Sequence, residues 1–364
     1  MKSKTFFIER PQATVLTDDL RQEVAVGPPF SSSVQRQVNS LYKSIFCLAS
    51  RFQKTGDGEI IYAWLAYSES GLKAAIFFSE KGGRINVLNE YFEMPGEFLE
   101  KFIDFVFSRY SCAETISCPS IRVAQLDVRF LLQRYRSTED IVIMLPDTVE
   151  QYDRSLGRST RDNLKRYQKR IFKNIQGIKF VCFNNAEVDE ALIQIIVDLN
   201  RARMDSKGQL CRHTEKSRAD LNRIVAAYGF VVIGEHNGRV CCGVICTIVD
   251  SHVYMHVVAH DPYYDSFRLG MVCCYLSVCG AIQRGAKSYH MLSGEYDYKF
   301  RLGGEKLDFD RITIYRSHFC VINNFGTYVG NVIRGNGRRI KMAIRDWRVH
   351  KGEKDDINSR RSSN

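Results

Sequence analysis

One apolar stretch in the second half of the chain constrains its fold most. Phe230–Glu235 and Arg239–Val249 are rich in β-branched residues and are joined by Asn237-Gly238, a dipeptide typical of a two-residue β-hairpin. Asp250-Ser251 then turns the chain into a third apolar run, His252–Ala259. This pattern predicts an antiparallel meander of three strands.

Predicted helices and strands surround this meander. A helix over Arg268–Arg284, capped by Asp265 or Ser266 and ended by Gly285, follows it. A short strand over Ser288–Leu292 and a closing strand over Lys306–Arg316 come next. Helical periodicity precedes the meander, over Arg158–Lys173, Val188–Met204 and Arg218–Tyr228.

The first half of the chain has its own mixed pattern of strands and a helix. Strand-like runs separated by Gly-containing turns are followed by Glu97–Tyr110, where Phe98, Phe102 and Val106 recur at helical spacing. The predicted strands are Ile60–Ser68, Leu72–Ser79, Arg84–Tyr91, Thr115–Cys118 and Asp140–Leu145. The predicted fold class is therefore α+β, with mostly antiparallel sheets flanked by helices.

A chain of 364 residues exceeds one comfortable hydrophobic core, so two domains are expected. The natural division lies near Asp147–Gln151, after a short apolar strand and Pro146. It predicts an N-terminal domain over residues 1–148 and a second domain over residues 149–318. Residues 319–364 would form an extension with a basic tail.

The composition excludes several classes of protein. No apolar run reaches membrane-spanning length, and the start, MKSKTFFIERPQ, lacks the pattern of a secretory signal. The twelve cysteines include no C-x-x-C pair, so neither a structural zinc nor a disulfide framework is expected. We therefore expect a cytoplasmic protein without a metal site. The sequence carries no signal for an oligomeric state.

The net charge of +11 indicates affinity for polyanions or phosphorylated ligands. The basic excess is concentrated in Arg158–Lys173 and in the tail, Arg334–Arg361. The first block has two interpretations of about equal weight. It is a solvated face of an amphipathic helix, or Arg161 and Arg166 contact phosphates or an anionic acceptor.

A dense polar and aromatic cluster follows the predicted strand at residue 292. The stretch HMLSGEYDYKFRLGG, residues 290–304, holds a carboxylate, a phenol and an ammonium group within five residues, at Glu295, Tyr298 and Lys299. Such groups suit proton transfer and anion stabilisation, and on one helical turn all three would share a face. The alternative is an amphipathic turn whose charges are only solvated.

The helix after the meander offers an anion site. A helix that begins directly after a central strand directs unpaired N–H groups and a positive dipole end at one spot, where a pyrophosphate binds well. Gly270 in the first turn would let phosphates approach the backbone, and Arg268 adds charge. Alternatively, Gly270 only permits close helix packing. Leu269 and Met271 complete this candidate cofactor site.

The order of elements resembles that of a GNAT acyltransferase domain. DIVIMLPDTVEQYDRSLGRSTRDNLKRYQKRI resembles the linker segment of the CelD/BcsL-type acetyltransferases. LSGEYDYKFRLGG resembles that family's L-x-G-acid-x-x-Tyr-Lys-x-x-Trp-Gly signature. The family usually has Asp, Pro and Trp where this chain has Glu295, Asp297 and Leu302. The matching residues are Leu292, Gly294, Glu295, Tyr298, Lys299 and Gly303.

The resemblance implies direct transfer from acetyl-CoA or another acyl-CoA to an amine or hydroxyl, in a small molecule or glycan precursor. Glu295 would deprotonate or orient the acceptor, Tyr298 would protonate the departing thiolate, and Lys299 would stabilise charge. Asp297 and, secondarily, His256 are candidate substrate contacts. The first half would be a divergent GNAT copy, as in FemAB-like tandem proteins.

Two other functions are compatible with the sequence. One is a FemAB-type aminoacyl transferase that uses charged tRNA and a cell-wall precursor, for which the basic blocks would supply phosphate contacts. The other is a non-catalytic polyanion-binding protein on the same scaffold. CoA retention and the salt dependence of tRNA binding would discriminate among the three.

Overall fold

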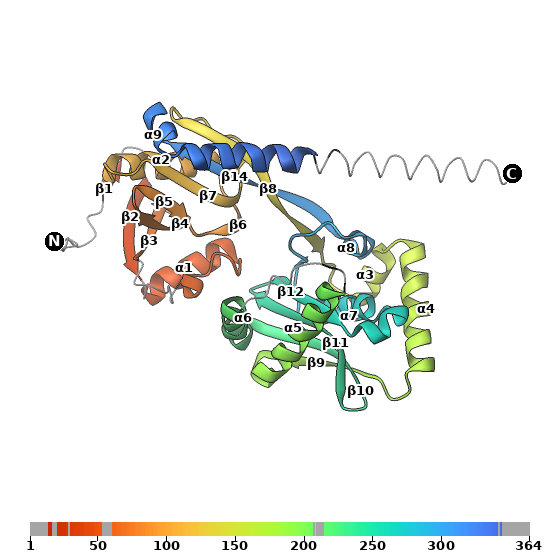
Figure 1. Ribbon diagram of the computed structural model, residues 1–364. Helices are drawn as coiled ribbons and strands as arrows, with labels where there is room; N and C mark the ends of the chain where they lie inside the picture. The colour runs from red at the N-terminus through yellow and green to blue at the C-terminus, as the bar shows by residue number, and fades with distance from the viewer. Residues whose placement is uncertain are drawn as a thin grey trace. The chain divides into compact units, whose positions relative to one another are not determined.

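The computed structural model describes residues 14–16, 20–27, 30–52, 60–206, 208, 215–340 and 343 (Figure 1). They form two compact units. Unit 1 takes its described residues from 14–41, 52–138 and 308–343, and unit 2 takes them from 42–51 and 139–307. Two of the bounds between the units, 138/139 and 307/308, lie inside strands. The division into domains at 148/149 stays a prediction.

Unit 2 contains the predicted meander. Its strand order is β8-β13-β12-β11-β10-β9, and all neighbours are antiparallel except β12 and β13, which are parallel. The positive φ angles of Asn237 and Gly238, 52° and 73°, match the expected hairpin turn. The strands are β8 (Leu131–Met144), β9 (Lys179–Asn184), β10 (Gly229–His236), β11 (Arg239–Val249), β12 (His252–His260) and β13 (Ser288–His290).

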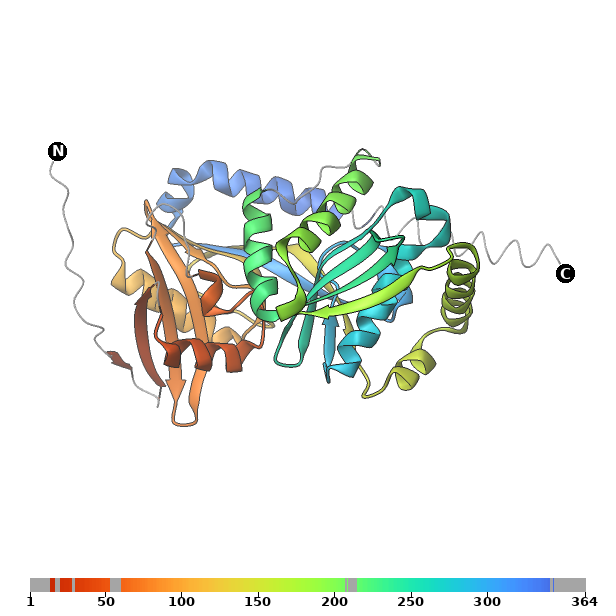
Figure 2. The ribbon, with the colours of Figure 1, turned by 90° about the horizontal axis from the view of Figure 1, so that it is seen from below.

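Helices cover both faces of this sheet (Figure 2). On one face α7 buries Val272 and Val278 in a core that includes Val253 and Met255 of β12. On the other face, side chains of α5 and α6 pack against Val231, Ile245 and Val257. The helices are α3 (Val149–Ser155), α4 (Arg158–Asn174), α5 (Glu190–Asp205), α6 (Glu215–Tyr228), α7 (Leu269–Gln283) and α8 (Asp297–Arg301).

Unit 1 also has a mixed set of strands with helices. Its strand order is β1-β2-β3-β4-β5-β7-β14, and β5 and β6 both pair with β7 in parallel. The strands are β1 (Thr14–Leu16), β2 (Leu20–Gly27), β3 (Ile61–Ser68), β4 (Gly71–Lys81), β5 (Arg84–Val87), β6 (Glu90–Glu93), β7 (Thr115–Arg122) and β14 (Glu305–Tyr315). The helices are α1 (Ser32–Tyr42), α2 (Gly96–Arg109) and α9 (His318–Asn323), followed by helical residues 325–340.

The predicted α+β class with mixed, mostly antiparallel sheets is confirmed. Several local predictions were wrong or incomplete. Strand β8 begins at Leu131, well before the predicted Asp140, and no element was predicted where strand β2 and helix α1 lie. Helix α7 has Arg268 as its N-cap rather than Asp265 or Ser266, because Asp265 is engaged by His260.

Two findings concern features that the sequence singled out. Among the residues that the structure describes, no helix is both long enough and apolar enough to cross a membrane. Of the basic tail, residues 341–342 and 344–361 lie outside the described residues.

Candidate active site

The first turn of α7 is the centre of the candidate site. A 3-10 helix, η4 (Pro262–Phe267), links β12 to it. Arg268 then adopts a left-handed conformation, with φ of 62°, and its carbonyl oxygen accepts the N–H groups of Met271 and Val272 at 3.1 and 3.2 Å. The helix therefore begins after η4 and not directly after the strand, with its positive dipole end toward this point.

A cavity of about 580 Å³ lies against this turn, a size typical of ligand sites. We call it the α7 cavity. Arg203 of α5 and Arg268 supply positive charge, while Nε2 of His260 contacts Asp265 Oδ1 at 2.5 Å. The cavity is lined by Arg203, Val258, His260, Asp265, Ser266, Arg268, Gly270, Met271 and Tyr298.

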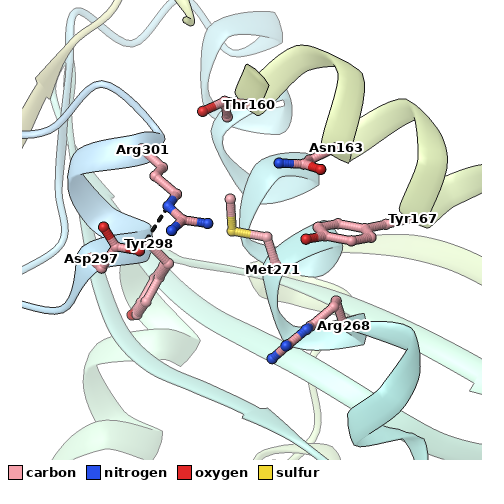
Figure 3. Close-up of a pocket in the computed structure, with 8 residues that line it drawn as sticks. All are labelled: Thr160, Asn163, Tyr167, Arg268, Met271, Asp297, Tyr298 and Arg301. Atoms are coloured by element: carbon pink, nitrogen blue, oxygen red, sulfur yellow. Dashed lines mark ion pairs between the residues drawn. The ribbon is translucent and has the colours of Figure 1, made fainter. Parts of the chain in front are cut away.

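A second pocket of about 310 Å³ shares Arg268, Met271 and Tyr298 with the α7 cavity, so the two adjoin. We call it the α4–α8 pocket (Figure 3). Figure 3 shows α4 residues on one side, α8 residues on the other and the Met271 thioether between them. Its remaining lining residues are Thr160, Asn163, Tyr167, Asp297 and Arg301.

The α7 cavity exists because two parallel strands part. The pairing of β12 with β13 ends at Tyr254 and His290. Beyond that point β12 continues to His260, and Val258 and His260 line the cavity. Residues 291–296 leave the sheet instead, which positive φ angles at Leu292 and Gly294, 54° and 98°, allow.

Buried charges hold this departing loop in place. Lys299 is 2% exposed, and its Nζ donates to the carbonyl oxygens of Met291, Leu292 and Ser293 at 2.6 to 2.8 Å. Burial lowers the pKa of Lys299 to about 8, although Asp140 and Glu139 oppose the shift. An ammonium group has three protons, so these three bonds occupy all of them.

Two carboxylates of strand β8 also hold this loop. Together with Lys299 we call them the loop clamp. Asp140 Oδ1 accepts the N–H of Leu292, and Glu139 Oε1 accepts the N–H of Gly294, both at 2.8 Å. Both acids are buried. Met291 N–H still donates to the Ile141 carbonyl oxygen of β8 at 2.7 Å. Beyond it, the lysine that donates to carbonyls and the two acids that accept N–H groups bind the backbone of the loop.

A hydrogen-bonded chain extends from Asp140 across the paired part of β12 and β13. Asp140 Oδ2 contacts His290 Nδ1 at 2.7 Å, and His290 Nε2 contacts Ser288 Oγ at 2.8 Å. The same hydroxyl contacts His252 Nδ1 at 2.7 Å. Burial, followed by the neighbouring His290, lowers the pKa of His252.

Tyr298 lies where the two pockets meet. Burial, with a smaller contribution from Cys274, raises the pKa of its phenol, while the positive charge of Arg203 acts in the opposite direction. Its ring stacks on Tyr296 with 6.2 Å between ring centroids. The phenol is therefore neutral near pH 7. The nearby positive charge of Arg203 would stabilise a negative charge that forms at this point.

The structure separates the three residues that the sequence predicted on one helical face. Glu295 precedes α8, is largely buried and pairs with Lys306 at 3.2 Å. Lys299 is engaged by the loop and Tyr298 lines the cavities. The prediction that all three share a helical face was wrong, because α8 begins only at Asp297. The Asp297 carboxylate pairs with Arg301 at 2.7 Å.

The predicted cofactor-binding residues differ in whether they line a pocket. Arg268 and Met271 line both pockets, whereas the Leu269 side chain is buried in the core. Gly270 lines the α7 cavity, but a Cβ there would lie 2.8 Å from His260 Nδ1. The packing explanation for this glycine is therefore supported by a specific contact.

The predicted substrate residues are more dispersed. Arg161 Nη1 donates to the carbonyl oxygens of Arg154 and Leu156 at 3.0 and 2.7 Å, so it secures the end of α3. Arg166 is exposed and donates to Asn163 Oδ1 at 2.7 Å. His256 Nε2 contacts Thr247 Oγ1 at 2.8 Å. Of the predicted substrate contacts, only Asp297 lines a pocket described above.

Sequence reasoning missed Arg203, His260 and the two acids of the loop clamp. Arg203 ends a predicted helix and His260 follows a predicted strand, so neither belongs to a motif. The apolar run after Asp140 predicted a strand, and only the packed fold shows that Glu139 and Asp140 meet a loop far along the chain.

Comparisons with known proteins agree with this architecture. Residues 158–300 match the family model for an acetyltransferase (GNAT) domain. No curated protein sequence matches the chain.

Solved structures resemble the chain at low identity. A crystal structure of FemX aligns with a TM-score of 0.50 and 10% identity over 70% of this chain and 88% of that one. A conserved protein of unknown function from Bacteroides thetaiotaomicron VPI-5482 gives 0.47 and 13%, covering 70% and 86%. A tandem GNAT protein from the clavulanic acid biosynthesis pathway gives 0.46 and 10%, covering 81% and 99%. The FemX likeness shows the fold alone.

Proposed function

We propose that the chain transfers an acyl group from an acyl-CoA, such as acetyl-CoA, directly to an amine or hydroxyl acceptor. The observation that carries this proposal is the position of Tyr298. Its phenol lies where the α7 cavity and the α4–α8 pocket meet, beside the first turn of α7. A single proton donor is thereby shared between a site suited to phosphates and a neighbouring pocket.

The α7 cavity suits the donor. Its lining includes Arg203, Arg268, Ser266 and the first turn of a fifteen-residue helix. Guanidinium groups and helix N-termini both bind phosphate oxygens. The volume exceeds what a pyrophosphate alone requires, which leaves room for part of the pantetheine arm. Val258 and Met271 offer apolar contacts for that arm.

Tyr298 is the proposed acid for the departing thiolate. A general acid must be protonated before the reaction, and burial keeps the phenol in that state. Arg203 lowers the cost of negative charge nearby, so it assists both transfer of the proton and stabilisation of the thiolate. Arg203 is thus proposed as a second charge-stabilising residue, in the role first given to Lys299.

Glu295 is the proposed contact for the acceptor. Its carboxylate pairs with Lys306 Nζ at 3.2 Å, and it would orient the acceptor or take its proton. Asp297 and Arg301 border the α4–α8 pocket and can bind polar groups of an acceptor. His256 remains a secondary candidate.

The acceptor class follows from the resemblance to CelD/BcsL-type acetyltransferases, which favours a glycan precursor or sugar amine. A first test measures CoA binding by calorimetry and then release of free thiol from acetyl-CoA across a panel of sugar amines, small amines and hydroxyls. Heat on CoA addition and thiol release that requires one acceptor are expected. Absence of CoA binding would remove this function.

One observation favours a second candidate, a tRNA-dependent aminoacyl transferase of the FemAB type. The outer side of α4 exposes Lys165, Arg166, Lys169, Arg170 and Lys173, and the fold resembles that of FemX. Tight tRNA binding that weakens steeply with salt, with no CoA binding, would support this candidate. If no aminoacyl transfer accompanies it, the chain is a non-catalytic polyanion-binding protein.

A further inference from the structure

The C-terminal helices of unit 1 expose a concentrated row of apolar side chains. Six of the fifteen large hydrophobic side chains that are exposed in the described part of the chain lie between residues 319 and 340. A concentration of this kind marks an interaction surface. The row consists of Phe319, Ile322, Phe325, Val332, Ile333 and Ile340. Figure 1 draws these helices, α9 and the run that follows it, in blue.

The row faces away from the core of unit 1. Asn331 is buried and its Nδ2 donates to Gln133 Oε1 and Thr313 Oγ1, both at 3.1 Å. At 3.6 residues per turn, Ile333 and Ile340 lie on the opposite side of the helix from Asn331. They are 66% and 59% exposed. Internal packing therefore uses one side of the helix and leaves an apolar side uncovered.

The same segment is strongly basic. Between Asp310 and Asp346 the sequence contains no acidic residue, whereas Arg334, Arg338 and Arg339 lie on the described helical run and Lys341 and Arg345 follow in sequence. An apolar row with basic neighbours is the pattern of a helix that lies at the interface of an anionic membrane. Apolar side chains enter the acyl boundary and cations meet lipid phosphates.

We propose that this helical face, residues 318–340, docks on an anionic lipid surface. The charge distribution favours lipid over a second copy of the chain, since two copies would bring like charges together. The exposed Phe and Ile side chains favour lipid over nucleic acid, whose backbone would use the arginines alone. Docking would hold the transferase domain near substrates at a membrane surface.

The test uses the full chain and sedimentation with vesicles of phosphatidylcholine, with or without phosphatidylglycerol. Binding to the phosphatidylglycerol vesicles, weakened by salt, is expected. Ile333→Ser and Ile322→Ser should each weaken it roughly ten-fold, because a buried Ile side chain contributes on this order. Ile195→Ser is the matched control, since Ile195 is also exposed, at 43%, but lies on α5. It should bind like the parent.

Several outcomes would overturn the proposal. They are no vesicle binding, equal binding to neutral vesicles, or equal losses in the control and test variants. A dimer in light scattering that Ile333→Ser dissociates, without vesicle binding, would assign the face to a second copy. Binding of tRNA but not vesicles would assign it to nucleic acid. Unchanged thermal unfolding of the variants ensures that a loss reports the surface.

Discussion

Helices α2 in unit 1 and α7 in unit 2 each connect a strand to a parallel neighbour, yet their first turns have different surroundings. The start of α7 borders a cavity that contains two arginines. The start of α2 is covered by its own chain. A Cβ on Gly96 would collide with the carbonyl oxygen of Gln125, and Glu100 accepts the N–H of Asp127. Glu97 adds a negative charge in the first turn.

The parallel strands differ in the same way. In unit 1, β7 is paired first by β5, at residues 115–117, and then by β6, at residues 120–122. In unit 2, β13 pairs with β12 over three residues only, and the loop clamp takes the chain out of the sheet. The GNAT-like order of elements is thus repeated, but the opening occurs in unit 2. A repeated fold does not imply a repeated site.

The largest expected effect concerns Tyr298, the α8 residue that lines both cavities. Tyr298→Phe should lower thiol release in the presence of a productive acceptor by about 10²–10⁴-fold, because it removes a general acid and little else. The rate of thiol release is measured by detecting free thiol continuously or at fixed times. Tyr296→Phe is the control, since Tyr296 is exposed and stacks on the same ring. Equal rates in both variants would remove Tyr298 from the chemistry.

The loop clamp should affect stability. Lys299→Met removes the donor for one buried and two part-buried carbonyl groups and the positive charge near Asp140 and Glu139, which should cost about 3–5 kcal/mol of unfolding free energy. Urea unfolding measures the change. Arg301→Met on the same helix removes an exposed ion pair and should cost less than about 1 kcal/mol. Similar losses for the two variants would mean that the clamp contributes no more than a surface pair.

The two helix starts can be compared directly by CoA affinity. Arg268→Gln should weaken CoA binding by about 1.5–3 kcal/mol, roughly ten-fold to a hundred-fold in Kd, if the guanidinium contacts a phosphate. Glu97→Gln at the start of α2 should leave the Kd unchanged. Calorimetry distinguishes the two sites. Tighter binding by Glu97→Gln with no change for Arg268→Gln would move the donor to unit 1.

The smallest effect concerns His252, at the first paired position of β12 and β13. The pKa of His252 is lowered by folding, so the unfolded chain binds its proton more readily than the native one. Its contribution to stability is therefore complete above the unfolded pKa of about 6.5 and falls as the pH drops below it. His252→Gln should reduce the loss of stability between about pH 7.5 and about pH 5.5. An identical pH dependence in both proteins would contradict this assignment.

Local patterns in the sequence determined much of the fold. The meander strands, their Asn-Gly hairpin and the helix that follows lie within about one residue of their predicted bounds, because turn residues and apolar periodicity act over a few neighbours. Strand β2 and helix α1 escaped prediction; α1 buries only Val38, so its apolar periodicity is weak. The polar cluster after β13 was also identified from sequence as the candidate site.

What the tertiary structure decided is the direction of each side chain in that cluster. Tyr298 and Lys299 are neighbours in sequence, but one lines two cavities and the other is buried beneath a loop. Their surroundings come from distant segments: Arg203 on α5, and Glu139 and Asp140 on β8. A sequence motif specifies the groups that are present. Only the parting of two strands, and the packing of remote elements against the gap, determines which group meets a ligand and which holds the backbone.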